Sequence, residues 1–213
     1  MSNIRIALPK GRLGDKAYGI FRDAGYCCPE MEEENRKLIF ENEELSLQFF
    51  WAKPSDVGTY VERGAADIGV VGKDVLLEDG NDVYELLDLG IGKCFMAVAA
   101  GKNKDLDEPE ILRVATKYPN CAKRYYSQLG KDIDIIKLNG SIEIAPVINL
   151  SDCIVDIVET GTTLRENDLV VKERIFDISA RLIANKVSFK FQNQRIREIV
   201  EKIKEVIADD KDN

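Results

Sequence analysis

Residues 151–164 read SDCIVDIVETGTTL, and this stretch decides how the rest of the chain is interpreted. It begins with an apolar, β-branched run from Cys153 to Val158, which is typical of a buried strand. A small, hydroxyl-rich turn follows at Glu159 to Thr163, and a helical segment follows the turn. Because the first N–H groups of a helix lack internal partners and carry partial positive charge, this strand–turn–helix predicts an anion site.

The turn favours a sugar phosphate over a nucleoside triphosphate. It contains no lysine, so it does not match the GxxxxGK[ST] loop. Gly161 allows the backbone to close around a ligand, and the threonines supply hydroxyl donors. Asp156 and Glu159 would repel phosphate, so we expect them to face sugar hydroxyls or Mg²⁺, as on a ribose 5-phosphate. The alternative is an ordinary N-capped helix start, since Thr caps and Thr-Gly turns are common.

Composition restricts the function classes. The chain has 213 residues, 45% hydrophobic and 32% charged, which is typical of a globular protein with one large domain or two small lobes. Its formal net charge of −8 argues against binding nucleic acid through a basic surface. No apolar run approaches the roughly 20 residues of a membrane span, and the N-terminus lacks a signal-peptide pattern. We therefore expect a cytoplasmic protein that binds no membrane.

Two residue types limit the chemistry. The five cysteines have no CxxC spacing, which favours free thiols in a reducing compartment over a disulfide or zinc framework. The chain contains no histidine, so proton transfer falls to carboxylates, Lys, Tyr or the substrate. Any metal is expected to be a hard, oxygen-ligated ion such as Mg²⁺.

A second candidate anion site lies near the N-terminus. A short β run at Ile4 to Leu8 is followed by Pro9-Lys10-Gly11-Arg12 and by an amphipathic helix, Leu13 to Ala24. Lys10 supplies a point charge and Arg12 a planar fork, both suited to phosphate. The alternative is a loop whose basic side chains are merely solvated.

The order of the remaining segments predicts an α/β fold of two lobes. In the second half, three β runs alternate with two helical patterns, which predicts parallel strands joined by right-handed crossovers. The β runs lie at 112–116, 133–138 and 153–158, and the helical patterns at 119–129 and 142–150. A β hairpin is expected earlier, at 37–40 and 45–50, and residues 169–184 are expected to carry the chain back. We predict lobe I at 1–93 plus 180–213, and lobe II, with the ligand turn, at 94–179.

Glu143 is a second carboxylate of interest, because it is the only charged residue from Leu138 to Leu150. Burying such a group without a partner would cost several kcal/mol, so we expect Glu143 to be exposed at a helix N-terminus or bound by a partner group. Its position after a Gly-Ser turn could place it beside Asp156. The alternative is a first-turn glutamate that interacts with the helix dipole.

At this point the sequence resembles the ATP phosphoribosyltransferase family, the first enzyme of histidine biosynthesis. The resemblance rests on ALPKGRL (7–13), ADIGVVGKD (66–74), NGSIEIAP (139–146) and SDCIVDIVETGTTL (151–164). It implies two lobes similar to type II periplasmic binding proteins, with the active site in the interlobe cleft. It also implies transfer of phosphoribosyl from 5-phosphoribosyl 1-diphosphate (PRPP) to N1 of the ATP adenine, releasing pyrophosphate with Mg²⁺ present.

The resemblance also implies roles for individual residues. Glu143 and Asp156 would be the catalytic carboxylates, with Asp156 on the ribose hydroxyls and both near the Mg²⁺ of Mg–PRPP. The 5′-phosphate would be held by Glu159, Thr160, Gly161, Thr162 and Thr163. The diphosphate and the ATP phosphates would face Lys10, Gly11, Arg12, Lys53 and Asp74.

Long-form members of the family continue into a C-terminal regulatory domain that binds histidine, and only a helix and a short tail follow Phe191 here. The chain therefore resembles the short form. That form implies a hetero-oligomer with a regulatory subunit resembling histidyl-tRNA synthetase, with a homodimer possible for the chain alone.

Two other functions are compatible with these residues. A type I phosphoribosyltransferase also has an acidic loop with a TG-T pattern, but its two acidic residues are usually adjacent, whereas Ile157 and Val158 separate Asp156 from Glu159 here. A non-catalytic binding protein would use the two lobes simply to capture a small anion.

Overall fold

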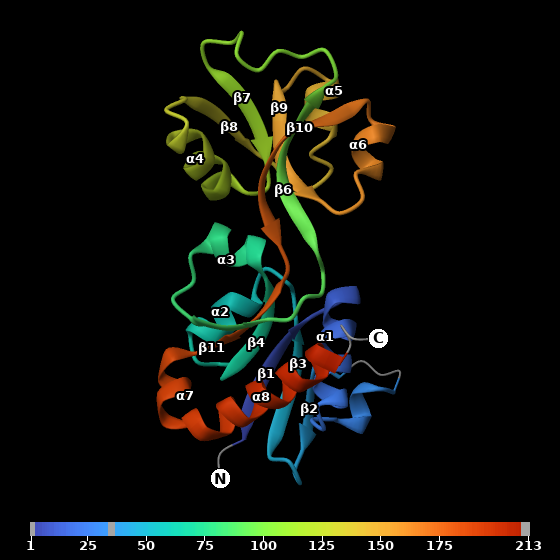
Figure 1. Ribbon diagram of the computed structural model, residues 1–213, viewed down its shortest axis with the longest axis vertical. Helices are drawn as coiled ribbons and strands as arrows, with labels where there is room; N and C mark the ends of the chain where they lie inside the picture. Colours follow the sequence, from blue (N-terminus) through green and yellow to red (C-terminus); the bar gives the residue numbers. More distant parts are fainter. Residues whose placement is uncertain (1–2, 34–36, 210–213) are drawn as a thin grey trace. The chain divides into compact units, whose positions relative to one another are not determined.

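The computed structural model describes residues 3–33 and 37–209. It divides into two compact units: unit 1 comprises residues 1–92 and 179–213, and unit 2 comprises residues 93–178. These boundaries lie one residue from those that the sequence predicts for the two lobes. Residues 1–2, 34–36 and 210–213 of the predicted lobe I lie outside the described residues. Each unit is built around its own β-sheet (Figure 1).

The described part of unit 1 contains a six-stranded mixed sheet in the order β2-β3-β1-β4-β11-β5. Its central strands β3, β1 and β4 are parallel, whereas β2 and β11 run antiparallel to their neighbours. β2 and β3 form the predicted hairpin. The strands span β1 Ile4–Pro9, β2 Ile39–Asn42, β3 Leu47–Ala52, β4 Ile68–Gly72, β5 Tyr84–Asp88 and β11 Ala180–Ala184.

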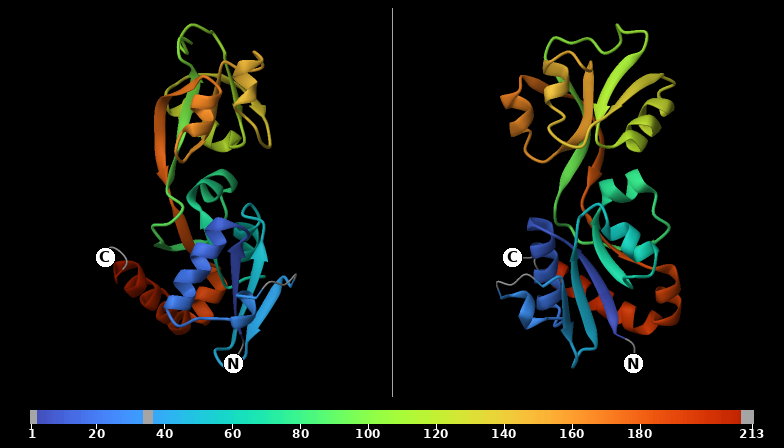
Figure 2. Two further views of the ribbon diagram at one scale, coloured as in Figure 1. Left: turned by 90° about the vertical axis from the view of Figure 1, so that its right-hand side faces the viewer. Right: turned by 180° about the vertical axis from the view of Figure 1, so that it is seen from behind.

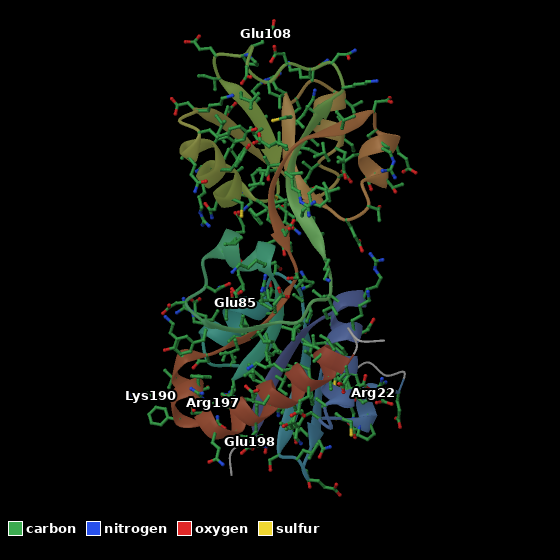
Figure 3. The ribbon with its side chains drawn as sticks, viewed as in Figure 1. Arg22, Glu85, Glu108, Lys190, Arg197 and Glu198 are labelled. Atoms are coloured by element: carbon green, nitrogen blue, oxygen red, sulfur yellow. The ribbon has the colours of Figure 1, made fainter. Side chains whose placement is uncertain are left out.

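Helices cover both faces of this sheet. Successive strand residues point to opposite faces, and here apolar side chains on both faces are buried. Ile6 and Leu8 of β1 pack with the first and last helices, α1 and α8, whereas Ala7 packs with α2. Figure 3 labels Arg197 and Glu198, which are exposed on the opposite side of α8 from its buried isoleucines. The helices span α1 Arg12–Asp23, α2 Val57–Glu62, α3 Lys73–Asp79, α7 Lys186–Phe191 and α8 Asn193–Asp209, with a 3₁₀ turn η1 at Pro29–Met31.

Unit 2 has a sheet in the order β10-β6-β9-β7-β8, seen from two further directions in Figure 2. The strands β7, β8 and β9 are parallel, which confirms the prediction, while β6 and β10 are antiparallel. The strands span β6 Cys94–Gly101, β7 Leu112–Thr116, β8 Ile133–Lys137, β9 Cys153–Val158 and β10 Leu169–Ile178. The helices span α4 Pro119–Gln128, α5 Ile144–Val147 and α6 Thr162–Glu166.

The extent of one predicted helix is wrong. The sequence pattern predicts a helix over 142–150, but α5 spans only Ile144–Val147. Asn149 has φ +58°, outside the helical region, and the N–H of Leu150 returns to the carbonyl oxygen of Ala145 at 2.9 Å, which closes the turn. Pro146 lacks an N–H and cannot support a longer helix around it. The apolar residues therefore form a single turn followed by a loop.

The two units share one strand topology. The order β3-β1-β4-β11-β5 in unit 1 matches β8-β7-β9-β6-β10 in unit 2, with the same parallel and antiparallel pairs. Each unit also carries an arginine–aspartate clamp, Arg5 with Asp67 and Arg113 with Asp152. In both clamps, the backbone N–H of the arginine and its side-chain Nε and Nη2 donate to the carboxylate. The backbone N–H of the aspartate donates to the carbonyl oxygen of the arginine. Equivalent strands can therefore be compared between the units.

No helix within residues 3–33 and 37–209 is both long and apolar enough to cross a membrane.

Candidate active site

The organising stretch folds as its sequence predicts, into a buried strand followed by a turn and a helix. Cys153, Ile154 and Val155 of β9 are at most 1% exposed, so the strand is fixed in the core. Gly161 adopts φ +71° at the start of α6, a left-handed conformation that glycine tolerates best. α6 is only five residues long, so its dipole is small. The loop's capacity for an anion therefore depends on its own N–H groups, hydroxyls and nearby cations.

Arg165 in α6 supplies a positive charge beside this turn, and the sequence interpretation missed it. Its Nη1 donates to the carbonyl oxygen of Thr160 at 3.1 Å, and its Nη2 donates to Oγ1 of Thr162 at 3.0 Å. The hydroxyls of these threonines lie 3.1 Å apart. Arg165 thus spans the turn from the helix side. The available signal was its spacing of three residues from Thr162, which brings two helical side chains onto one face.

Asp156 lies near the end of β9, with Ile157 and Val158 between it and the turn that begins at Glu159. It pairs in register with Ala97 of β6, and the alternation along β9 places it on the same face as Ile154. That face carries the core made with α5 and α6. Asp156 Oδ1 accepts the backbone N–H of Ile157 at 2.8 Å. The carboxylate is partly exposed at the sheet edge.

Glu143 approaches the same face from α5. It is the N-cap residue of that turn and is partly exposed. Its neighbours Ile142 and Ala145 are buried in the core that also contains Ile154. Because β8 and β9 are both parallel to β7, their carboxyl ends share one edge of the sheet. Unit 2 therefore brings Glu143, Asp156 and the 159–163 turn to one edge and one face.

Unit 1 carries the basic residues, at the carboxyl ends of its own parallel strands. Lys10 directly follows β1 and Lys53 directly follows β3, and the N–H of Lys10 donates to the carbonyl oxygen of Ala52 at 2.8 Å. Gly11 has φ +95° and is the N-cap residue of α1, which begins at Arg12. Lys10, Arg12 and Lys53 have exposed side chains. This unit therefore presents a basic edge.

Asp74 differs from the other predicted site residues because it is 9% exposed. It lies in the first turn of α3, and its carboxylate is folded back over Gly72, where a Cβ added to that glycine would lie 2.2 Å from Oδ1. The unit therefore places Asp74 against its own backbone rather than on the exposed basic edge.

Carboxylates, threonine hydroxyls, backbone N–H groups and the Arg165 guanidinium are among the polar groups at the carboxyl edge of unit 2. All five cysteines are free, as predicted, and burial raises the pKa of the Cys153 thiol to about 11. That thiol stays protonated near neutral pH. Within residues 3–33 and 37–209, no three His, Cys, Asp or Glu side chains gather as a metal site. A cation such as Mg²⁺ would therefore need ligands from the substrate in addition to Glu143 or Asp156.

Comparisons with known proteins agree on one family. The family model described as "HisG: ATP phosphoribosyltransferase" matches residues 53–205. The ATP phosphoribosyltransferase of Brachyspira hyodysenteriae is 58% identical, covering 96% of this chain and all of that protein. The enzyme of the same name from Halalkalibacterium halodurans is 51% identical, with 99% of each chain covered.

Solved structures agree with this fold. A chain of the ATP phosphoribosyl transferase (HisG:HisZ) complex from Thermotoga maritima has a TM-score of 0.84 and 36% identity, covering 96% of this chain and 98% of that chain. The periplasmic aliphatic sulphonate binding protein SsuA from Escherichia coli has a TM-score of 0.61 at 13% identity, covering 98% of this chain and 73% of that chain. The SsuA similarity concerns the fold alone, and it agrees with the predicted likeness to periplasmic binding proteins.

Proposed function

This chain belongs to the ATP phosphoribosyltransferase family, and from that premise we propose how its residues divide the work of the reaction. The enzyme transfers phosphoribosyl from PRPP to N1 of the ATP adenine, giving N1-(5-phosphoribosyl)-ATP and pyrophosphate, in the first step of histidine biosynthesis. As a biosynthetic enzyme of this kind, it is proposed to act in the cytoplasm.

The turn after β9 holds the 5′-phosphate of PRPP in this proposal. The observation that carries it is the arrangement of this turn, with Gly161 at φ +71°, two threonine hydroxyls 3.1 Å apart and the Arg165 guanidinium bonded across it. Backbone N–H groups, hydroxyls and a guanidinium are the usual donors to phosphate oxygens. The proposed set is Glu159, Thr160, Gly161, Thr162 and Thr163, with Glu159 turned to the sugar side.

Asp156 and Glu143 hold the ribose, at the same edge and face as the turn. Displacement at an anomeric carbon develops positive charge on the sugar, and two carboxylates on one face would stabilise it. Mg²⁺ bound to the diphosphate would neutralise the leaving group, and Asp156 and Glu143 have the oxygen ligands that this ion prefers. The absence of a three-residue metal cluster in the described residues is compatible with an ion that arrives with PRPP.

The basic edge of unit 1 takes the polyphosphate groups. Lys10, Arg12 and Lys53 are exposed there and would bind the diphosphate or the ATP phosphates, with Gly11 allowing close backbone approach. Asp74 belongs to the same proposed set. As a carboxylate it would accept hydrogen bonds from hydroxyl or amino groups of the nucleotide rather than contact its phosphates.

The reaction makes small demands on acid–base chemistry. Adenine N1 carries a lone pair and no proton, so its attack on the sugar requires no strong base. This agrees with a chain that contains no histidine. The protein's task is to orient the donor in line with N1 and to neutralise the leaving group.

A regulatory partner forms part of the proposal. The Thermotoga maritima chain comes from a HisG:HisZ complex, and this chain covers 98% of it. We propose that this chain likewise assembles with a regulatory subunit resembling histidyl-tRNA synthetase, which would carry the histidine feedback. A homodimer is the proposed state of the chain alone. Light scattering of the chain with and without a co-expressed partner tests both states.

The release of pyrophosphate from PRPP and ATP tests the active-site assignment. The wild-type chain, with its partner if needed, should release pyrophosphate only when both substrates and Mg²⁺ are present. Asp156→Asn should lower kcat by at least about 100-fold, which is the scale of losing one charge-stabilising group. Asp132→Asn, an exposed change in the same unit, is the control. Wild-type turnover by Asp156→Asn would remove Asp156 from the mechanism.

A further inference from the structure

In unit 2 a lysine, Lys117, directly follows strand β7, much as Lys10 directly follows strand β1 in unit 1. β7 is the counterpart of β1, since each lies between two parallel neighbours in the repeated strand order. Lys10 directly follows the last residue of β1, and Lys117 directly follows Thr116, the last residue of β7. The carboxyl edge of unit 2 therefore has a lysine of its own.

The backbone of Lys117 is held beside Asp156. Thr116 pairs in register with Val155, so the next position along β7 lies next to Asp156 on β9. Two hydrogen bonds fix this turn: Thr116 Oγ1 donates to the carbonyl oxygen of Val155 at 2.6 Å, and the N–H of Tyr118 donates to the same Oγ1 at 2.8 Å. Thr116 is fully buried. The lysine thus extends from a rigid point one strand away from the proposed ribose-binding carboxylate.

The ammonium group of Lys117 is available for a ligand. The side chain is exposed, and in the described residues it makes no hydrogen bond or ion pair. Its Nζ lies 5.8 Å from the centre of the Tyr118 ring. By contrast, Lys104 and Lys131 in the same unit are paired with aspartates. The ammonium group of Lys117 can offset the repulsion that the two carboxylates at the same sheet edge would exert on a phosphate ligand.

The order of the strands indicates which phosphate group of PRPP would lie near Lys117. α6 packs on β10, and a hollow of about 300 Å³ beside the turn is lined by Phe95 of β6 and Val170 of β10. The phosphate turn therefore leaves β9 toward β6 and β10, whereas β7 and Lys117 lie on the other side of β9. With the ribose at Asp156 and its 5′-phosphate in the turn, the substituent on C1 points toward β7. In PRPP that substituent is the diphosphate.

We propose that Lys117 binds the diphosphate of PRPP and neutralises it as it leaves. The proposal rests on the proposed placement of the sugar phosphate in the 159–163 turn. In the reaction the C1–O bond breaks with its electron pair going to the diphosphate, and the C1–N1 bond forms from the adenine lone pair. Lys117 stays protonated throughout and transfers no proton.

Two ligands that differ only in the C1 group test the proposal directly. PRPP and ribose 5-phosphate would each be titrated into the intact enzyme in Mg²⁺ by isothermal calorimetry. Lys117→Met should weaken PRPP binding by about tenfold or more, the scale of one charge-assisted hydrogen bond, and ribose 5-phosphate binding by less than about twofold. Lys117→Arg should restore part of the loss. Lys123→Met, an exposed lysine on α4, should bind both ligands like wild type.

The outcomes separate this proposal from the one on which it rests. If Asp156→Asn weakens the binding of both ligands but Lys117→Met binds PRPP like wild type, the proposed role of Lys117 is overturned. The proposed ribose site at Asp156 is then retained. If Lys117→Met weakens both ligands equally, Lys117 contacts the 5′-phosphate or the ribose, which also overturns it. If wild-type enzyme binds PRPP and Asp156→Asn changes nothing, the proposed ribose site itself fails. Thermal melting of each variant confirms that the fold is intact.

Kinetics provide a second readout that a purely structural role would not move. Lys117→Met should lower kcat and kcat/KM for PRPP while leaving the KM for ATP unchanged, because the cation acts on the leaving group. An equal rise in both KM values with unchanged kcat would contradict the proposal.

Discussion

The guanidinium of Arg165 donates from Nη1 to the carbonyl oxygen of Thr160, 3.1 Å away, across the left-handed turn at Gly161. A second donor, Nη2, bonds Oγ1 of Thr162 at 3.0 Å. These bonds hold the turn closed from the helix side and place a positive charge beside a loop that contains no lysine. The loop is thus shaped by a residue outside it.

Removing this cation should weaken donor binding more than folding. Arg165→Gln is expected to raise the KM for PRPP about 10-fold or more with a small change in melting temperature, since the side chain is exposed. Arg165→Lys should recover only part, because an ammonium cannot reproduce the fork. Steady-state kinetics with varied PRPP measure the effect. Arg197→Gln on the outer face of α8 is the control, and an equal KM change there would contradict the prediction.

Two features of position 161 favour glycine over a residue with a side chain. Its φ of +71° disfavours any side chain by about 1 kcal/mol, and a Cβ would lie 3.4 Å from Nη1 of Arg165. Gly161→Ala should therefore reduce PRPP affinity markedly. Gly130→Ala is a matched control, because Gly130 has φ +67° and no atom within 4 Å of a Cβ. Both variants should lose similar stability in urea unfolding, and only Gly161→Ala should lose affinity. Equal affinities would contradict the prediction.

Glu143 should act on turnover rather than on folding. Glu143→Gln removes the charge from a partly exposed N-cap position and keeps its size. We expect kcat to fall by about 10-fold or more while the melting temperature stays close to wild type. Unchanged kcat would exclude Glu143 from the ribose site, and a large drop in melting temperature would assign it to the start of α5.

The clamp in unit 2 should make stability depend on pH. Arg113 holds the pKa of Asp152 well below its usual range of about 4. A lowered folded-state pKa means that the stabilisation is complete above the unfolded-state pKa and is lost as the pH falls below it. Asp152→Asn should therefore lower the free energy of unfolding by about 2 kcal/mol at pH 7. The difference in unfolding free energy between this variant and wild type should shrink as the pH is lowered through about 4. Urea unfolding at several pH values measures it. Asp132→Asn should show no such gap.

Much of the fold follows from local sequence pattern, because β-branched runs and helical spacing report on short segments. The β9 strand, the parallel β7, β8 and β9, and the β2–β3 hairpin were predictable in this way. The length of α5 was not, since the left-handed residue Asn149 ends a stretch whose apolar pattern suits a helix. That residues 169–184 form two separate strands, β10 and β11, was not predicted, because the sequence shows only a run of alternating apolar and charged residues there.

The site was only partly visible in sequence. Asp156 and the 159–163 turn are contiguous and follow a strong strand signal, so their proximity could be predicted. The role of Arg165 depends on a backbone turn, and that of Lys117 depends on which strands are neighbours. The Arg5–Asp67 and Arg113–Asp152 clamps join residues far apart in the chain, so only the folded sheets bring them together.

The central claim is that the turn after β9 binds the sugar phosphate. Backbone amide NMR of the isotope-labelled enzyme during titration with ribose 5-phosphate tests it most directly. The account predicts that the largest shifts occur at Thr160 to Thr163, with Asp156 and Arg165 Nε also perturbed, and that all of them vanish in Gly161→Ala at the same ligand concentration. Saturable shifts that leave this turn unmoved would contradict it.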